Sequence, residues 1–269
     1  MENTIIKVDN VSKSFHVGAG DVSILKNISL DISSGDFVII FGPSGCGKST
    51  LLHTILGLEP PNQGAILFLG NNLYERTSRT MITEPSTRRY FIKNTQVIDE
   101  DERSEIRKKH IGMVYQQANW IKALTVAENI AFPLQLLGHT KPEALTKAAE
   151  MLDMMGMTAW ANYIPTELSS GQQQKTALAR ALVTNPEFII ADEPTGNLDY
   201  ESGQELMQIL TKFNTELHKT ILMVTHDLEY LSYAKTAVRM FNGEIVGTYK
   251  GERKNDLLKE LKGKRGNGD

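Results

Sequence analysis

The stretch that decides the fold is Gly42-Pro43-Ser44-Gly45-Cys46-Gly47-Lys48-Ser49. It matches the pattern G-x-x-x-x-G-K-[ST], which is typical of a loop that wraps around phosphate groups. The continuous apolar run of residues 37–41 precedes it and predicts a buried strand. Apolar residues then recur with helical spacing, at Leu51, Leu52, Ile55 and Leu58. The motif therefore stands between a strand and a helix, the context that it needs.

The residue types of this loop suit the binding of a nucleoside triphosphate. Glycines let successive backbone N–H groups converge on phosphate oxygens, and the helix N-terminus adds partial positive charge. Lys48 would bring a full charge to the β and γ phosphates, and Ser49 would ligate Mg²⁺. A glycine-rich turn without a ligand is the weaker alternative, because motif and context agree. The expected contacts with ATP are Gly42, Pro43, Ser44, Gly45, Cys46, Gly47, Lys48, Ser49 and Thr50.

A second predicted strand ends in two adjacent carboxylates. The apolar residues 188–191 are followed directly by Asp192 and Glu193. Two roles explain two acids: Asp192 would hold Mg²⁺ through its water shell, and Glu193 would polarise the attacking water. Taken alone, the pair has a simpler alternative, which is a solvated strand end.

The remaining pattern predicts an α/β fold with two kinds of sheet. Apolar runs that each precede a polar residue and then a helical pattern are typical of a parallel sheet; they are residues 111–115, 188–191 and 221–224. Alternation through Ile28, Leu30 and Ile32 predicts a half-buried strand of a second, antiparallel β subdomain.

Three further segments complete the expected architecture. Residues 125–157 show helical spacing, with Pro142 where a helix would begin, and predict an inserted α-helical subdomain over about 118–176. Asn242-Gly243 is suited to a two-residue hairpin turn. Residues 1–10 alternate polar and apolar residues, which predicts a strand rather than a secretory signal.

Two segments show no sustained period. Residues 73–109 are polar and carry both signs of charge. We expect a solvated loop there, with a partner-binding element as the alternative. The charged tail of residues 251–269 is expected to fray.

Composition excludes several classes of protein. The formal net charge of -3 gives no bulk reason to expect nucleic acid as a partner. The apolar runs are far shorter than the roughly 20 residues of a membrane-spanning helix, so a membrane role would pass through a partner. The single cysteine, Cys46, cannot form an internal disulfide, which fits a reducing cytoplasm. Its place among N–H dipoles and beside Lys48 predicts a reactive thiolate that MgATP would shield, whereas a buried and inert thiol is the alternative.

The most specific pattern is Leu168-Ser169-Ser170-Gly171-Gln172, which resembles the signature motif of ATP-binding-cassette (ABC) ATPases, usually Leu-Ser-Gly-Gly-Gln. Gln116, the run Gly196-Asn197-Leu198-Asp199 and His226 follow strands in the order found in that family. The resemblance covers roughly residues 5–247, and chance agreement of five ordered motifs is negligible. It implies the fold of a P-loop NTPase of the ABC type.

The resemblance also implies roles for residues outside the phosphate loop. Two copies pack head to tail, and each ATP lies between one copy's phosphate loop and the other's signature motif. Ser169, Gly171 and Gln172 would contact the γ-phosphate across that interface, at a helix N-terminus. His226 would contact the same phosphate and orient the water with Glu193.

Three more residues take roles from the resemblance. Gln116 would reach the metal and the water while its loop touches the partner protein. Asp199 would lie at the dimer seam. Phe15 would stack on adenine, worth roughly 1 to 3 kcal/mol, although a core phenylalanine is its alternative. The implied catalytic residues are Lys48, Gln116, Glu193 and His226, and the implied metal ligands are Ser49, Gln116 and Asp192.

The chain departs from the family pattern at two positions. Ser170 replaces the usual first glycine of the signature, and Lys175 stands where arginine is common. Neither removes an expected phosphate donor. Ser170 would strain the backbone if that position needed a positive φ.

Residues 127–134 and 191–199 resemble the lipoprotein-release, macrolide-export and cell-division subgroup. Members of that subgroup pair with membrane proteins. This implies an ABC ATPase domain over residues 5–250 that works as a homodimer in the cytoplasm, beneath a separate permease on the inner face of the membrane. The insert of residues 73–109 is longer than the linker usual there.

Two alternatives belong to other classes. A soluble ABC ATPase could act on ribosomes, DNA or metal-cluster assembly, but neither a tandem second cassette nor a long coiled coil is visible in the sequence. A regulatory nucleotide-binding module without turnover is disfavoured by the presence of Lys48, Glu193 and His226.

Overall fold

The computed structural model describes residues 4–18, 20–83, 90–117 and 119–266. Its largest sheet contains β3 (Phe37–Phe41), β8 (Ile111–Val114), β9 (Phe188–Asp192), β10 (Thr220–Thr225), β11 (Thr236–Phe241) and β12 (Glu244–Lys250). The strand order is β12-β11-β3-β10-β9-β8. The pairs from β11 to β8 are parallel, whereas β12 pairs antiparallel with β11 through the turn at Asn242-Gly243. The predicted parallel core and the predicted hairpin are both confirmed.

A second sheet is antiparallel and has the order β2-β1-β4-β5. Its strands are β1 (Thr4–Val17), β2 (Gly20–Ser33), β4 (Gln63–Phe68) and β5 (Asn71–Asn72). Ile28, Leu30 and Ile32 point into the core while their neighbours are more exposed, as the alternation predicted.

β3 separates two hydrophobic cores. Phe37, Ile39 and Phe41 belong to the core that the helices cover on one face of the parallel sheet. Val38 and Ile40 belong to the other core, with α1 (Lys48–Ile55) and the antiparallel sheet. A strand that is buried on both faces needs apolar residues at every position, which explains the unbroken run of residues 37–41.

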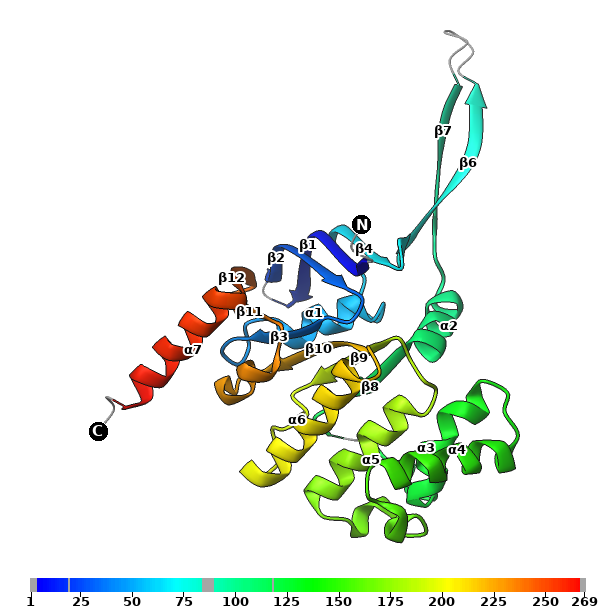
Figure 1. Ribbon diagram of the computed structural model, residues 1–269. Coiled ribbons are helices and arrows are strands. Elements are labelled where there is room, and N and C mark those ends of the chain that lie inside the picture. The colour runs from blue at the N-terminus through cyan, green and yellow to red at the C-terminus, as the bar shows by residue number, and fades with distance from the viewer. Residues whose placement is uncertain (1–3, 19, 84–89, 118, 267–269) are drawn as a thin grey trace.

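Four of the α-helices gather on one side of the parallel sheet (Figure 1). They are α3 (Val126–Leu136), α4 (Lys141–Met154), α5 (Ser170–Leu182) and α6 (Tyr200–Thr215), with the short 3-10 turns η1 (Thr158–Trp160), η2 (Pro165–Glu167) and η3 (Leu228–Tyr233). Pro142 is the second residue of α4, where the sequence placed a helix start. Thr125 caps α3, because its hydroxyl accepts from the backbone N–H of Glu128 at 3.2 Å.

The expectation of a solvated loop over residues 73–109 is wrong. This segment forms β6 (Glu75–Thr83) and β7 (Tyr90–Val97), an antiparallel pair that projects away from the rest of the molecule, and α2 (Glu100–His110) (Figure 1). α2 begins with three acidic residues and ends with four basic ones, and Asp99 caps its N-terminus. These charges stabilise the helix through its dipole, so no apolar period is needed.

The base of this insert is tied to α1, the helix of the phosphate loop. The buried Tyr74 hydroxyl contacts the carbonyl oxygens of Thr54 at 2.7 Å and Glu59 at 2.9 Å. Arg107 of α2 lies 3.4 Å from the carbonyl oxygen of Leu56, at the C-terminus of α1. The hairpin therefore stands on a base that belongs to the core.

The C-terminal segment also differs from its prediction. Residues 251–266 form α7 (Gly251–Gly266) instead of fraying. Leu257 is buried, and the ammonium of Lys254 donates to the carbonyl oxygens of Ser232, at 3.2 Å, and of Ala234. Leu257, the partly buried Leu258 and these bonds fasten the helix to the core and to η3.

Candidate active site

The phosphate loop lies between β3 and α1, and its backbone needs glycine at two points. Gly47 has a φ of 101°, and a Cβ there would lie 2.9 Å from the carbonyl oxygen of Ile24. A Cβ at Gly42 would lie 2.1 Å from the carbonyl oxygen of Met240. Both residues are therefore glycine for steric reasons, independent of any ligand.

Lys48 is the first residue of α1 and turns back over the loop. Its Nζ donates to the carbonyl oxygens of Gly42 at 2.9 Å and Pro43 at 3.1 Å. Nζ also lies 3.8 Å from Oε1 of Glu193. The side chain is buried, so the ammonium is held in place by oxygen atoms that phosphate oxygens can replace.

Ser49 and Asp192 meet across the loop. The Ser49 hydroxyl donates to Oδ1 of Asp192 at 3.2 Å. Burial raises the pKa of the Asp192 carboxyl, and the hydrogen bond from Ser49 partly opposes the rise. A half-buried carboxylate of this kind is destabilising unless a cation or a further donor reaches it.

Glu193 and His226 form the second contact at this edge of the sheet. The distance from Nδ1 of His226 to Oε2 of Glu193 is 2.9 Å. Because an ionised carboxylate only accepts, Nδ1 is the donor, which leaves Nε2 for another partner. Glu193 has a φ of 45°, in the left-handed region, where a side chain with a Cβ is seldom found. Such backbone strain is typical of functional positions.

One cavity of about 420 Å³ collects Lys48, Ser49, Asp192 and Glu193, whereas His226 lies outside its lining. Its size suits a small-molecule ligand. Gln116, from the segment after β8, lines it from a separate strand end. The cavity is lined by Ile24, Ser44, Gly45, Gly47, Lys48, Ser49, Thr50, Gln116, Asp192 and Glu193.

The residues of the signature motif stand apart from this cavity. Ser169 caps α5, and its hydroxyl accepts from the backbone N–H of Gln172 at 3.3 Å. Gly171 packs against α6, because a Cβ there would lie 2.8 Å from Oγ of Ser202. Ser170 is the first residue of α5 and has no positive φ, so its replacement of glycine introduces no strain. Among the described residues that line the cavity, none comes from this motif.

Asp199 and Phe15 also lie outside the lining of the cavity. Asp199 caps α6: its carboxylate accepts from the backbone N–H and from the hydroxyl of Ser202, at 2.8 and 2.9 Å, and these bonds lower its pKa. Phe15 is 36% exposed at the end of β1, with Nζ of Lys13 at 4.8 Å from its ring centroid. That exposure does not fit the alternative of a core phenylalanine and leaves the ring accessible for stacking.

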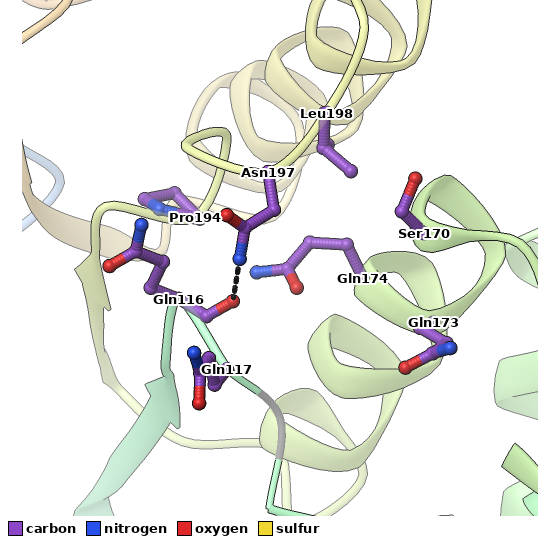
Figure 2. A pocket seen from close by; sticks show the side chains of 8 residues that line it. All are labelled: Gln116, Gln117, Ser170, Gln173, Gln174, Pro194, Asn197 and Leu198. Carbon is purple, nitrogen blue, oxygen red and sulfur yellow. Dashed lines mark hydrogen bonds between the residues drawn. The ribbon is translucent and has the colours of Figure 1, made fainter. Parts of the chain in front are cut away.

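A smaller cavity of about 250 Å³ lies between the Gln116 segment, α5 and the turn after β9 (Figure 2). The Nδ2 of Asn197 lies 3.5 Å from the carbonyl oxygen of Gln116. The cavity is lined by Gln116, Gln117, Ser170, Gln173, Gln174, Pro194, Asn197 and Leu198. Gln173 and Gln174 were not among the site residues predicted from the sequence, although three glutamines in a row directly after the signature glycine were a visible signal.

Cys46 is packed in the core and does not line the cavity of the phosphate loop. Its side chain is 6% exposed and belongs to the core that includes α1 and the antiparallel sheet. The prediction of an accessible thiolate is therefore not supported by the position of Cys46, and the alternative of a small buried residue fits better.

The donor set fits magnesium and a nucleotide. Ser49 and Asp192 offer a hydroxyl and a carboxylate oxygen, which suits a metal that takes its other ligands from phosphates and water. Among the described residues there is no cluster of three or more His, Cys, Asp and Glu side chains, so an all-protein metal cage is absent from that part of the chain. Within the same part, no helix is both long and apolar enough to cross a bilayer.

Known proteins resemble this chain over most of its length. The ABC transporter family model matches residues 25–196. An ABC transporter ATP-binding protein of Methanocaldococcus jannaschii, MJ1508, is 40% identical over 242 residues, which cover 90% of this chain and 98% of that protein. The lipoprotein-releasing system ATP-binding protein LolD of Colwellia psychrerythraea is 31% identical over 241 residues, 90% of this chain and 85% of that protein.

A solved structure resembles the fold closely. It is the dimeric post-hydrolysis state of the ATP-binding cassette MJ0796 of Methanocaldococcus jannaschii, bound to ADP and Pi. Its TM-score is 0.78 at 36% sequence identity, with 91% of this chain and 98% of that chain covered.

Proposed function

Because the chain belongs to the ABC transporter family, we propose that its ATP hydrolysis powers a separate membrane permease through closure of a head-to-tail homodimer. The chain is an ATP-binding and ATP-hydrolysing subunit. The observation that carries the proposal is the separation of Ser169 from a cavity that already holds Lys48, Asp192 and Glu193. In a two-fold head-to-tail dimer, a second copy would bring the N-terminus of its α5 to this cavity.

Each side chain in the cavity has a role that its contacts support. Lys48 would exchange the carbonyls of Gly42 and Pro43 for the β and γ phosphates. Ser49, Asp192 and Gln116 would hold Mg²⁺, which neutralises phosphate charge when it is bound. Glu193, oriented by His226, would accept the proton of the attacking water.

The remaining residues would act across the dimer. Ser169 is exposed at the N-terminus of α5, and Gly171 and Gln172 beside it are half-buried. This helix end would offer the Ser169 hydroxyl and a positive dipole to the γ-phosphate of the other copy. Asp199 would lie at the seam between the copies, and Phe15 would stack on adenine.

The permease would place the chain on the inner face of the cell membrane, in the cytoplasm. The similarity to LolD favours the lipoprotein-release type of partner. We assign residues 5–250 to the ATPase domain, residues 118–176 to its helical subdomain and α7 to a C-terminal extension. The small formal net charge of -3 gives no electrostatic reason to propose nucleic acid as a partner.

Gel filtration with MgATP tests the dimer. Glu193→Gln should bind ATP without turnover and shift from monomer to dimer, because a glutamine keeps the shape of the site but cannot take the proton. Lys48→Ala should stay monomeric with MgATP, since it lacks the charge that holds the phosphates. A Glu193→Gln variant that binds ATP tightly and remains monomeric would contradict the proposal.

A further inference from the structure

Trp120 and Gln173 connect the Gln116 segment to the start of α5. The indole Nε1 of Trp120 donates to Oε1 of Gln173 at 3.1 Å, and Nε2 of Gln173 donates to the carbonyl oxygen of Leu168 at 3.0 Å. Leu168 directly precedes Ser169, the N-cap of α5. An indole N–H only donates, so Trp120 requires the amide oxygen of Gln173 to face it. The amide nitrogen of Gln173 then faces the carbonyl oxygen of Leu168.

Other contacts hold the same segment against the same helix. Nε2 of Gln174 donates to the carbonyl oxygen of Tyr115 at 3.1 Å. Arg180, two turns further along α5, donates to the carbonyl oxygen of Asn119 at 2.9 Å. The guanidinium carbon of Arg180 lies 4.7 Å from the ring centroid of Trp120. Arg180 therefore orients the ring, and the ring orients Gln173.

The two ends of this connection would face different nucleotides in the proposed dimer. Gln116 lines the cavity of its own copy, whereas Ser169 would reach the ATP of the other copy. Figure 2 shows Gln173 and Gln174 on the same helix as Ser170, beside the segment that carries Gln116 and Gln117. A change in the position of Gln116 on ATP binding thus has a path of contacts to the signature motif.

We propose that Trp120 is a positioning residue that acts through Gln173 to fix the carbonyl of Leu168, and so couples the two ATP sites of the dimer. The proposal rests on the head-to-tail arrangement described above. Without the indole N–H, the Gln173 amide can rotate about its broad terminal torsion, and the peptide before Ser169 loses a fixed donor. The first ATP would still bind, but the composite site would form less often.

Trp120→Phe tests this step because it removes the N–H and keeps an aromatic ring over Arg180. We expect kcat to fall about 2- to 10-fold, the range that one net hydrogen bond represents, and the Hill coefficient for ATP to approach 1. The dissociation constant for ATP without turnover should stay within about twofold. Trp160→Phe is the matched control, since it changes the other of the 2 tryptophans, outside both cavities.

A double variant separates positioning from general stability. If Trp120 acts through Gln173, Trp120→Phe with Gln173→Leu should be no slower than Gln173→Leu alone. Multiplying losses would overturn the proposal, and so would a Trp120→Phe protein with the kcat and Hill coefficient of the wild type. Failure of Glu193→Gln to dimerise with MgATP would instead overturn the dimer on which the proposal rests.

Fluorescence gives a second measurement that needs no change at Trp120. In Trp160→Phe combined with Glu193→Gln, Trp120 is the sole tryptophan. We expect its emission to shift when MgATP closes the dimer, because its indole N–H and its ring both contact α5, the helix that would meet the ATP of the other copy. A dimer that forms without any change in this emission would show that Trp120 does not take part in closure.

Discussion

His226 Nδ1 lies 2.9 Å from Oε2 of Glu193, although 33 residues separate the two in the chain. The contact exists because β9 and β10 are parallel neighbours, with Asp192 paired to Val224, so that both strands end at the same edge. The imidazole faces the carboxylate from its own strand end and limits the directions in which Glu193 can point.

This contact predicts a specific defect for His226→Ala. The rate of phosphate release should fall about 10²- to 10⁴-fold, the range for loss of effective general base catalysis, while ATP binding remains close to normal. The loss should not multiply with that of Glu193→Gln, since both changes disable one unit. Full additivity of the two losses would mean that His226 acts independently of Glu193.

Asp192→Asn should separate stability from function. The native pKa of Asp192 is raised, so the folded protein binds the proton more tightly than the unfolded chain does. Stability of the nucleotide-free wild type should therefore fall as the pH rises from the ordinary pKa of 3.8 through the raised native value. At neutral pH the half-buried carboxylate is charged, and Asp192→Asn should raise the Tm while it removes magnesium-dependent ATP hydrolysis.

Thermal unfolding from pH 4 to 8, without nucleotide, checks this prediction. The pH dependence of the Tm in this window should be smaller in Asp192→Asn than in the wild type. Asp9→Asn is a control, because Asp9 is half-exposed on β1. It should change neither the Tm nor its pH dependence strongly. A lower Tm for Asp192→Asn at neutral pH would show that the hydrogen bond from Ser49 outweighs the cost of burial.

The insert should tolerate the loss of its hairpin but not of its base. Replacing residues 79–93 by Asn-Gly would close the pair Ser78 and Asn94 with a two-residue turn and should leave folding and ATP hydrolysis intact. A deletion that includes Tyr74 should destabilise the protein, because its hydroxyl contacts two carbonyls at the end of α1.

Tyr74→Phe isolates that contact. We expect a loss of about 0.5–1.5 kcal/mol in the free energy of unfolding, the net value of one hydrogen bond, because the carbonyl oxygen of Thr54 still accepts from the backbone N–H of Gly57. Tyr163→Phe is the control, since Tyr163 is exposed. Equal stability of the two variants in urea would remove the hydroxyl of Tyr74 from the interactions that hold the insert.

Cys46 should react slowly with maleimide in the folded, nucleotide-free protein and quickly in urea. Its side chain is packed in the core, so reagents reach it only on opening of the structure. Mass spectrometry after brief treatment measures the labelled fraction. Fast labelling of the native protein that MgATP prevents would instead support the hypothesis of a reactive thiolate at Cys46.

The phosphate loop and the two strand-end acids were predictable from the sequence because their chemistry is local. Gly42, Gly47 and Lys48 are set by the steric and charge needs of one short turn. The unbroken apolar run of residues 37–41 likewise follows from burial on both faces of one strand. Such signals lie within a few residues of one another, so a single chain displays them.

Tertiary structure alone decided the contacts between distant segments. α2 has no fully buried residue and therefore no apolar period, and its docking through Arg107 and the partly buried Ile106 shows that it belongs to the core. α7 attaches through Leu257, Leu258 and Lys254. The path from Trp120 through Gln173 to Leu168 joins residues 53 apart with single hydrogen bonds. A hydrogen bond between distant residues leaves no periodic pattern in sequence, because its geometry arises only when the sheet and helices have packed.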